Sequence, residues 1–279
     1  MKGMIIVPAC NEGASLQKFL PRLHESLTKI SEFNISVVVI NDGSDDNTVQ
    51  VAEECGCRVV TNKRNRGNGY SIRRGLQLAL EEQCTFVVTM DADGQHDEKL
   101  LPTILAQFGE GAEVIIASRY HLESQRIGVP DDRDMLNIMA RSIIHALTGW
   151  WQLTDPLCGF WVINRRVLQF LTQELKQDRY GVFLESIIKL WYLCDPRPKL
   201  IEVPHPAIYR NHDELRLLTR EYSPANRLER TKRFDDHANQ MLEVLDDVRS
   251  VVEIDAELEH LKAEWRKHET RPQKGAEVE

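Results

Sequence analysis

The sequence lacks the features that mark a membrane-spanning, secreted or nucleic-acid-binding protein. No apolar run among the 279 residues reaches the roughly 20 residues that a membrane-spanning helix needs. The first residues enter an apolar stretch without the charged and apolar regions of a secretory signal, so we expect a cytoplasmic protein whose membrane contact is peripheral. A net charge of −8 disfavours nucleic acid as a partner, because phosphate backbones bind to basic surfaces.

Cysteines are present, but they are not arranged as a disulfide framework or a metal cluster. The six cysteines are scattered and form no Cys-x-x-Cys pair, so we expect reduced thiols. Cys55 and Cys57 are close in sequence, but no second pair completes a soft-metal site. The hydrophobic content of 42% and the charged content of 28% are ordinary for a globular protein.

Short apolar segments alternate with amphipathic ones over the first 120 residues. The apolar segments, rich in Val and Ile, predict strands at residues 4–8, 34–40, 57–60, 86–90 and 114–117. Apolar residues at helical spacing predict helices at roughly 15–30, 48–54, 70–82 and 100–108. This alternation predicts an α/β fold, with a mostly parallel sheet flanked by helices.

Polar loops follow the carboxyl ends of several of these strands, at residues 41–48, 65–69 and 91–95. In an open α/β sheet those ends face the ligand crevice, so we expect the loops to meet along one edge. Asp91 and Asp93 lie two residues apart in the last loop, and Gly94 allows a sharp turn. Paired carboxylates suit Mg²⁺ or Mn²⁺, particularly where substrate phosphates complete the coordination shell. The alternative is a pair of solvated turn residues.

The second half of the chain is less regular. Residues 121–133 are polar, which is typical of a lid over a site. Helices are expected at 135–148 and 182–193, and a late strand at 200–204. The adjacent Arg165 and Arg166 are candidates for a clamp on an acceptor phosphate, and the alternative is that both are solvated. His96, just past the acidic loop, is interpreted as a surface histidine and not as a further metal ligand.

A change in composition after residue 222 predicts a separate C-terminal part. We expect a catalytic domain over residues 1–222, a charged helical extension over 223–269 and a disordered tail over 270–279. Apolar residues from Val244 to Trp265 step by threes and fours along the extension. That seam can pack on the catalytic body, on another helix or on a second copy as a homodimer.

Taken together, these motifs resemble the inverting family 2 glycosyltransferases of GT-A (Rossmann-like) fold, most nearly the dolichyl-phosphate-mannose synthase type. The resemblance covers roughly residues 4–210. The motifs that carry it are residues 7–12, 41–46, Asn65 with Gly67 and Gly69, 91–95, 118–120, and Asp155 with 158–160.

The resemblance implies a role for each matching residue. Asp91, Asp93 and Gln95 would hold Mg²⁺ or Mn²⁺ against the diphosphate of a GDP- or UDP-sugar. Ser118 and Arg119 would lie near the acceptor, where Arg165 is also a candidate. Glu12 would lie near the ribose, and Asp42 would accept a hydrogen bond from the base. The implied donor-binding residues are Pro8, Cys10, Asn11, Glu12, Asp42, Asp91, Ala92 and Arg210.

The acceptor decides what catalytic groups are needed besides Asp93. A polyprenyl phosphate, the leading acceptor, is already an anionic nucleophile. A hydroxyl on a glycan or small molecule would need a carboxylate as general base, and Asp155 and Glu185 are the candidates. A nucleotidyltransferase is disfavoured, because residues 8–12 lack the glycine-rich basic loop expected after the first strand. A nucleotide-sugar-binding protein without transferase activity remains an alternative.

Overall fold

A seven-stranded sheet forms the centre of the protein, and the computed structural model describes residues 1–209 and 227–249. The strands of the sheet are β1 (Lys2–Ala9), β2 (Asn34–Asn41), β3 (Arg58–Thr61), β4 (Phe86–Thr89), β5 (Val114–Ser118), β7 (Trp161–Asn164) and β8 (Leu200–Pro204). Their order is β3-β2-β1-β4-β7-β5-β8. A separate pair is formed by β6 (Arg126–Ile127) and β9 (Ala207–Ile208).

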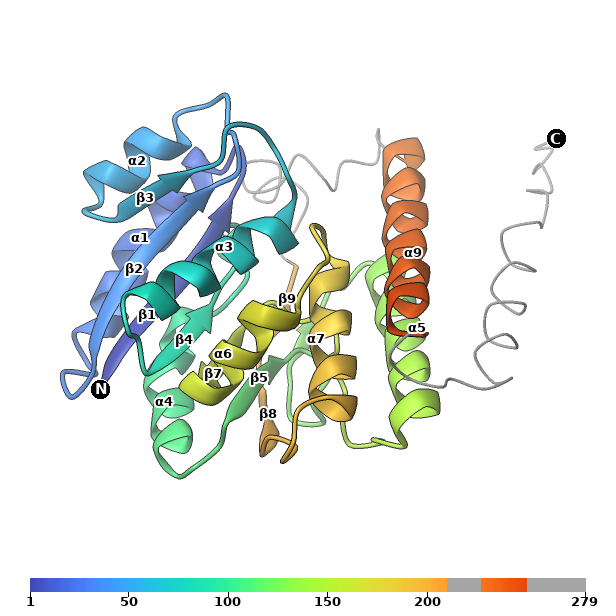
Figure 1. The fold of residues 1–279 in the computed structure, drawn as a ribbon. Coiled ribbons are helices and arrows are strands. Elements are labelled where there is room, and N and C mark those ends of the chain that lie inside the picture. The colour runs from blue at the N-terminus through green and yellow to red at the C-terminus, as the bar shows by residue number, and fades with distance from the viewer. Residues whose placement is uncertain (210–226, 250–279) are drawn as a thin grey trace, which may run out of the picture.

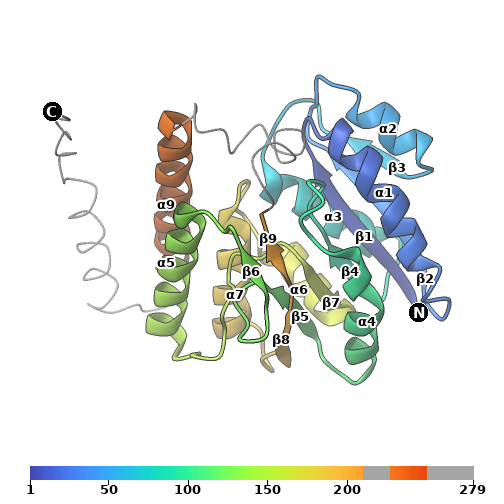
Figure 2. The ribbon, with the colours of Figure 1, turned by 180° about the vertical axis from the view of Figure 1, so that it is seen from behind.

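Helices cover both faces of this sheet. They are α1 (Gly13–Leu27), α2 (Thr48–Glu54), α3 (Asn68–Glu81), α4 (Leu101–Gly109), α5 (Asp131–Thr148), α6 (Arg165–Glu174), α7 (Gly181–Tyr192) and α9 (Arg227–Arg249). Figures 1 and 2 show α3 and α6 on one face and α1 and α4 on the other, while α5, α7 and α9 pack against one another. The predicted α/β fold with a mostly parallel sheet is therefore confirmed.

The central strands are apolar because both of their faces are covered. Residues 4–7 of β1 and 86–88 of β4 have no exposed surface. Gly75 lets α3 approach β1 closely, since a Cβ atom there would lie 2.5 Å from the Ile6 side chain. This contact fixes α3 and the glycine-containing loop that leads into it.

One strand, β7, runs against the direction of its neighbours. It pairs antiparallel with both β4 and β5, and its last residue, Asn164, lies opposite Phe86 at the start of β4. Arg165 follows at once, so it lies at the amino-terminal end of β4, away from Asp91 at the other end. The sequence did not predict this strand, because four apolar residues without alternation resemble other short buried segments.

The segment expected to be a lid contains β6, which belongs to the two-stranded sheet. Arg126 and Ile127 of β6 pair in parallel with Ala207 and Ile208 of β9. Helix α5 then begins at residue 131, four residues earlier than predicted. Residues 126–133 thus have a regular backbone, which the sequence did not predict, and a role of this segment as a lid stays a prediction.

Helix α9 packs on the catalytic body through α5 and α7. Its buried apolar residues are Ala238, Met241, Val244, Leu245 and Val248. Gly181 of α7 permits the contact, since a Cβ atom there would lie 2.9 Å from Cγ2 of Val244. Over the described residues the predicted seam thus packs on the body. Its remainder and the predicted tail lie outside the described residues, and the domain boundaries and the homodimer stay predictions.

Within residues 1–209 and 227–249, no helix combines the length and the apolar character of a membrane span.

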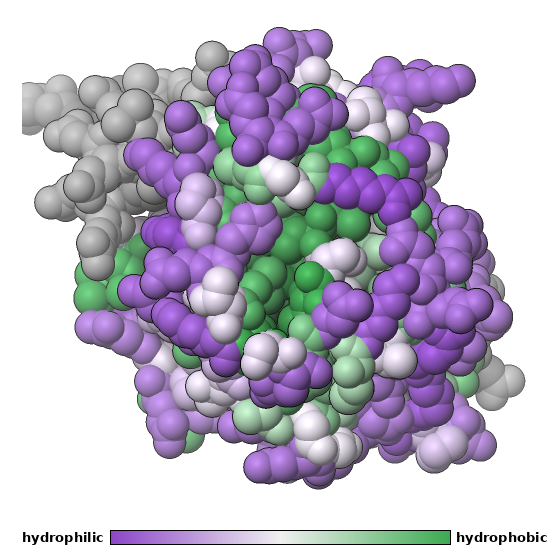
Figure 3. Space-filling model, turned by 90° about the vertical axis from the view of Figure 1, so that its left-hand side faces the viewer, coloured by the Kyte–Doolittle hydropathy of each residue, from purple (hydrophilic) through white to green (hydrophobic). Residues whose placement is uncertain are grey.

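Figure 3 shows the side on which β3 lies, where hydrophilic side chains surround a hollowed apolar centre. Val59 and Val60 of the edge strand β3 are half-buried, and Arg58 beside them forms an ion pair with Glu82. Such charges discourage edge-to-edge pairing with another sheet.

Candidate active site

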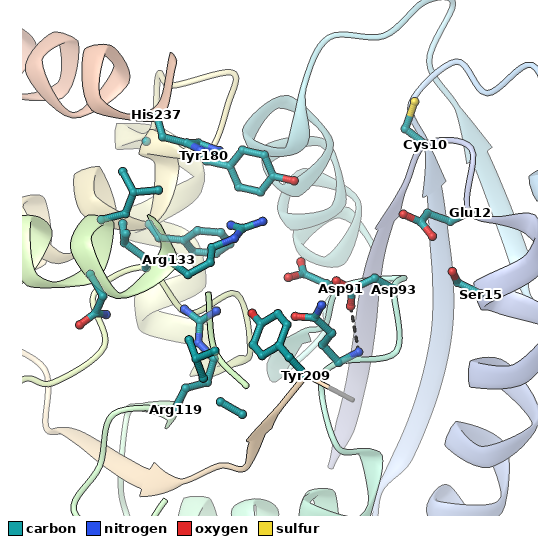
Figure 4. Close-up of a pocket in the computed structure, with 18 of the residues that line it drawn as sticks. Cys10, Glu12, Ser15, Asp91, Asp93, Arg119, Arg133, Tyr180, Tyr209 and His237 are labelled. Atoms are coloured by element: carbon teal, nitrogen blue, oxygen red, sulfur yellow. Dashed lines mark hydrogen bonds between the residues drawn. The ribbon is translucent and has the colours of Figure 1, made fainter. Parts of the chain in front are cut away.

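Two adjoining cavities lie beside the loops that follow β1, β2 and β4. The larger has a volume of about 770 Å³ and the smaller about 360 Å³. Figure 4 shows the carboxylates of Asp91 and Asp93 on one side of the cavity, and Arg119 and Arg133 on the other. Residues that line both cavities are Cys10, Glu12, Asp91, Asp93, Arg133, Tyr180 and His237.

The loop after β4 brings the predicted metal-binding residues to one wall. Asp91 and Asp93 line both cavities, and Gln95 lines the larger one. The Oδ1 atom of Asp93 accepts a hydrogen bond from the backbone N–H of Gln95 at 2.9 Å. Gly94 has a φ of 73°, as the tight turn requires. Gly159 leaves room for Asp91, since a Cβ atom there would lie 3.0 Å from its Oδ1 atom.

The electrostatics of Asp91 are set by burial and by the two arginines. Removal from water raises the pKa of the Asp91 carboxyl above its ordinary value. The charges of Arg119 and Arg133 lower this pKa, but they offset the effect of burial only in part. The side chain is still 36% exposed, so it is accessible from the cavity. A cation between Asp91 and Asp93 would add to the stabilisation of the ionised carboxylates.

His96 lies buried beneath this loop, and the expectation of a surface histidine is wrong. Its Nδ1 atom accepts a hydrogen bond from the backbone N–H of Asp91 at 2.9 Å, and its ring stacks on Phe160. Burial and the charge of Arg119 lower the pKa of His96 to about 3, so the ring is neutral near pH 7. Its proton then sits on Nε2, which lies 3.5 Å from Oδ2 of Asp91.

The loops after β2 and β3 are joined through Asp42. This carboxylate accepts hydrogen bonds from the backbone N–H groups of Arg66 and Gly67 and from the amide of Asn62. Of the predicted donor residues, Pro8, Asp42 and Ala92 line the smaller cavity, Asn11 lines the larger one, and Cys10, Glu12 and Asp91 line both. Arg210 lies outside the described residues.

The basic side of the cavity is held in place by a buried carboxylate. Asp155 has no exposed surface, and its two oxygens accept hydrogen bonds from Nε and Nη2 of Arg119 at 2.8 and 2.9 Å. The Asn137 amide adds a further hydrogen bond at 3.0 Å. This bidentate pair raises the pKa of Arg119, despite the opposing effect of burial. Arg119 therefore lines the cavity as a fixed cation.

The structure corrects three of the predicted positions. Asp155 is taken up by Arg119 and does not line either cavity, so it is not placed as a general base. Ser118 is fully buried and shares a hydrogen bond with Thr154, behind the cavity wall. Arg165 donates to the backbone carbonyl of Cys84 at the far end of β4, where it cannot reach an acceptor beside Asp91.

Glu185 is also misplaced by the sequence prediction. The side chain has no exposed surface and forms an ion pair with Lys189 at 2.6 Å. It also accepts hydrogen bonds from the backbone N–H groups of Lys176 and Gln177. The Glu185 carboxylate thus binds the backbone of residues 176–177, before α7, and it lines neither cavity. We therefore interpret Glu185 as a residue that stabilises the fold and not as a catalytic base.

This assignment predicts that Glu185→Gln changes stability and not turnover. Removal of one partner leaves the Lys189 charge buried, at a cost of about 3–5 kcal/mol. We expect a matching loss in the free energy of unfolding measured in urea, with kcat unchanged at temperatures where the variant is folded. The double variant Glu185→Leu with Lys189→Met should recover much of the stability. Loss of turnover at unchanged stability would contradict the structural role.

Sequence reasoning missed Arg133 and Tyr209, which both line the larger cavity. Arg133 lies in the first turn of α5, and Tyr209 follows β9. Neither belongs to a motif with fixed spacing. The only signal for Arg133 was its place as the last residue of the polar segment 121–133, and that segment was interpreted as a lid.

Comparisons with known proteins agree with this fold. Residues 4–172 match the family model described as glycosyl transferase family 2. The chain is 28% identical over 224 residues to a dolichol-phosphate mannosyltransferase of Pyrococcus furiosus, covering 78% of this chain and 59% of the relative. It is 25% identical over 230 residues to a UDP-N-acetylglucosamine–dolichyl-phosphate N-acetylglucosaminyltransferase of Methanococcus voltae, covering 76% and 88%.

Solved structures show the same fold. Glucosyl-3-phosphoglycerate synthase of Mycobacterium tuberculosis, solved with Mn²⁺, UDP and glucosyl-3-phosphoglycerate, has a TM-score of 0.57 and 22% identity. The match covers 79% of this chain and 76% of that one. The fold is that of GT-A enzymes, and the family model spans more than half of the chain. This chain therefore belongs to glycosyltransferase family 2, and it is a glycosyltransferase.

Proposed function

We propose that this enzyme is a metal-dependent, inverting glycosyltransferase that moves a sugar from a nucleotide-diphosphate sugar to a polyprenyl phosphate. The observation that carries the proposal is the division of one cavity into an acidic and a basic side. Asp91 and Asp93 lie on one side, and Arg119 and Arg133 on the other. The acidic side suits a divalent cation with its diphosphate, and the basic side suits an anionic acceptor.

The residues of the acidic side fit Mg²⁺ or Mn²⁺. Asp91, Asp93 and Gln95 offer hard oxygen ligands on one turn. Among the described residues, no three His, Cys, Asp or Glu side chains are grouped as a self-contained metal centre. A cation here would therefore need further oxygen ligands, which a diphosphate provides. When bound, it would supply positive charge to the leaving nucleoside diphosphate.

The acceptor side favours an acceptor that needs no general base. Asp155 and Glu185, the two base candidates, are both buried in ion pairs. A phosphate is already ionised, so Arg119 and Arg133 would only need to position it. Its oxygen would bond to the anomeric carbon while the bond to the diphosphate breaks, and the electron pair would leave on the nucleoside diphosphate. Direct displacement of this kind inverts the anomeric configuration.

Apolar side chains near the basic side support a lipid acceptor. Three large apolar residues within seven positions of Arg133 in the sequence are exposed: Ile127, Met135 and Ile138. Two relatives are named for dolichyl-phosphate acceptors, which is consistent with this choice. Such a surface would let the enzyme act peripherally at a membrane, where polyprenyl phosphates reside.

Arg133→Ala should test the acceptor side. We expect a rise of about tenfold to a hundredfold in the KM for polyprenyl phosphate, because one charge-assisted contact to the phosphate is lost. Steady-state rates with varied polyprenyl phosphate at saturating donor would measure this change. Arg126→Ala is the matched control, since Arg126 pairs with Asp134 and does not line the cavity. Equal KM values for both variants, or turnover with hydroxyl acceptors alone, would contradict the proposal.

A further inference from the structure

Helix α9 places side chains in both cavities, although it lies beyond the residues that the family model covers. His237 lines both cavities, and Met241 lines the larger one. Asp236 and Gln240 line the smaller one. Figure 4 shows His237 beside Tyr180, whose ring reaches into the space in front of Asp91. The C-terminal extension is thus a wall of the site as well as a packing element.

The contacts of α9 fix this wall. The rings of His237 and Tyr180 meet edge to face, with their centroids 4.8 Å apart. Gln177 donates a hydrogen bond from its side chain to Asp247 at 3.0 Å. These contacts, the buried apolar face of α9 and the close approach at Gly181 hold α9 against the body that carries the loop of residues 91–95.

The smaller cavity lies between α9 and the loops implied in nucleoside binding. Pro8, Asp42 and Gly67 line it from the sheet side, and Gln240 and Asp236 line it from α9. Asp91 and Asp93 also line this cavity. A nucleoside diphosphate held at the two carboxylates would therefore have room for its nucleoside part between the loops and the helix.

Gln240, which lines the smaller cavity, has a side-chain oxygen without a hydrogen-bond partner among the described residues. The residue is 7% exposed, and its Oε1 atom is buried without a hydrogen-bond partner among the described residues. Buried amide oxygens are nearly always satisfied, so an unpaired one at a cavity points to a missing partner. With the Asp236 carboxylate, the wall offers acceptors, which suit the hydroxyl groups of a ribose or the N–H groups of a base.

We propose that α9 forms the second wall of the donor site, with Gln240 as a binding residue for the nucleoside part of the donor and His237 as a positioning residue for Tyr180. This inference rests on the proposed function, because it takes the Asp91 and Asp93 side as the diphosphate site. Gln240 accepts a hydrogen bond from the ribose or the base, and His237 holds Tyr180 over the diphosphate. The donor site is then a composite of the family domain and the C-terminal extension.

Calorimetric titration of the full-length chain with UDP and with GDP, each in Mn²⁺, tests this wall. We expect His237→Ala and Gln240→Leu to weaken nucleotide binding by about fivefold or more, the effect of one ordinary hydrogen bond or ring contact. Leucine is similar to glutamine in size and lacks its polar atoms. Glu243→Ala, an exposed position on the same helix, is the matched control and should bind as the unaltered chain does.

The outcomes separate this inference from the proposed function. Weaker nucleotide binding by either variant, with a melting temperature equal to that of Glu243→Ala, supports the proposal that α9 forms part of the donor site. Unchanged binding by both variants, while Asp93→Ala no longer binds, overturns the wall and leaves the proposed function standing. Absence of Mn²⁺-dependent binding by the unaltered chain would contradict the proposed function and the wall together.

Discussion

Replacement of Asp93 by alanine is expected to lower kcat by about a hundredfold to a thousandfold, the effect of removing one preorganised charge-stabilising group. Asp93 lines both cavities, and its hydrogen bond from the Gln95 backbone fixes the turn of the loop. Without this carboxylate, the protein would hold the cation through Asp91 and Gln95 only, beside the oxygens of the diphosphate. Initial rates at saturating donor and acceptor, with Mn²⁺ present, would measure the loss.

The matched control for this experiment lies four residues further along the loop. Asp97→Asn changes a carboxylate that accepts a hydrogen bond from the Lys99 backbone and lines neither cavity. This variant should keep nearly full turnover. Comparable losses in both variants would mean that the loop as a whole matters and would contradict the specific role of Asp93. Full turnover of Asp93→Ala in Mn²⁺ would contradict the metal site itself.

Asp155→Asn is expected to destabilise the fold by about 3–5 kcal/mol, because the Arg119 side chain, only 20% exposed, would lose its fully buried ion-pair partner. The lost carboxylate accepts hydrogen bonds from the backbone and the side chain of Arg119 and from Asn137. At about 2–4 °C per kcal/mol for a domain of this size, the melting temperature should fall by roughly 10 °C. Transfer should also weaken, since Arg119 would lose its fixed orientation at the cavity.

An exposed ion pair provides the comparison for this result. Asp134→Asn removes the carboxylate that pairs with Arg126 on the surface, where such pairs contribute about 0–1 kcal/mol. Its melting temperature should therefore change by a few degrees at most. Thermal unfolding of both variants under the same conditions is the measurement. Equal shifts in the two variants would contradict the claim that the buried carboxylate of Asp155 holds Arg119 in place.

The strands and the acidic loop were predictable because their signals are local. Residues 86–90 are apolar, and Asp91 and Asp93 follow directly, so strand and site appear in one short run. Helix α2 was predicted to the residue, and the confirmed sheet followed from the alternation of strands and helices. The common polarity of parallel strands then placed the loops after β1, β2 and β4 around the same cavities.

The errors arose where position depends on contacts that are distant in sequence. The direction of β7 is set by its pairing with β4 and β5, and that direction carries Arg165 to the wrong end for an acceptor clamp. Glu185 and Asp155 resembled free acids in sequence. Their partners include the backbone at residues 176–177 and the Arg119 side chain, which only the folded chain brings within reach.

The most direct test is the product formed from a nucleotide-diphosphate sugar and polyprenyl phosphate. The full-length chain would be incubated with UDP- and GDP-sugars of known α configuration, with Mn²⁺ or with EDTA. NMR of the purified product should show a β-linked sugar phosphate lipid, formed only when the metal is present. An α-linked product, undiminished yield in EDTA, or a product formed only with hydroxyl acceptors would contradict inverting transfer to a lipid phosphate.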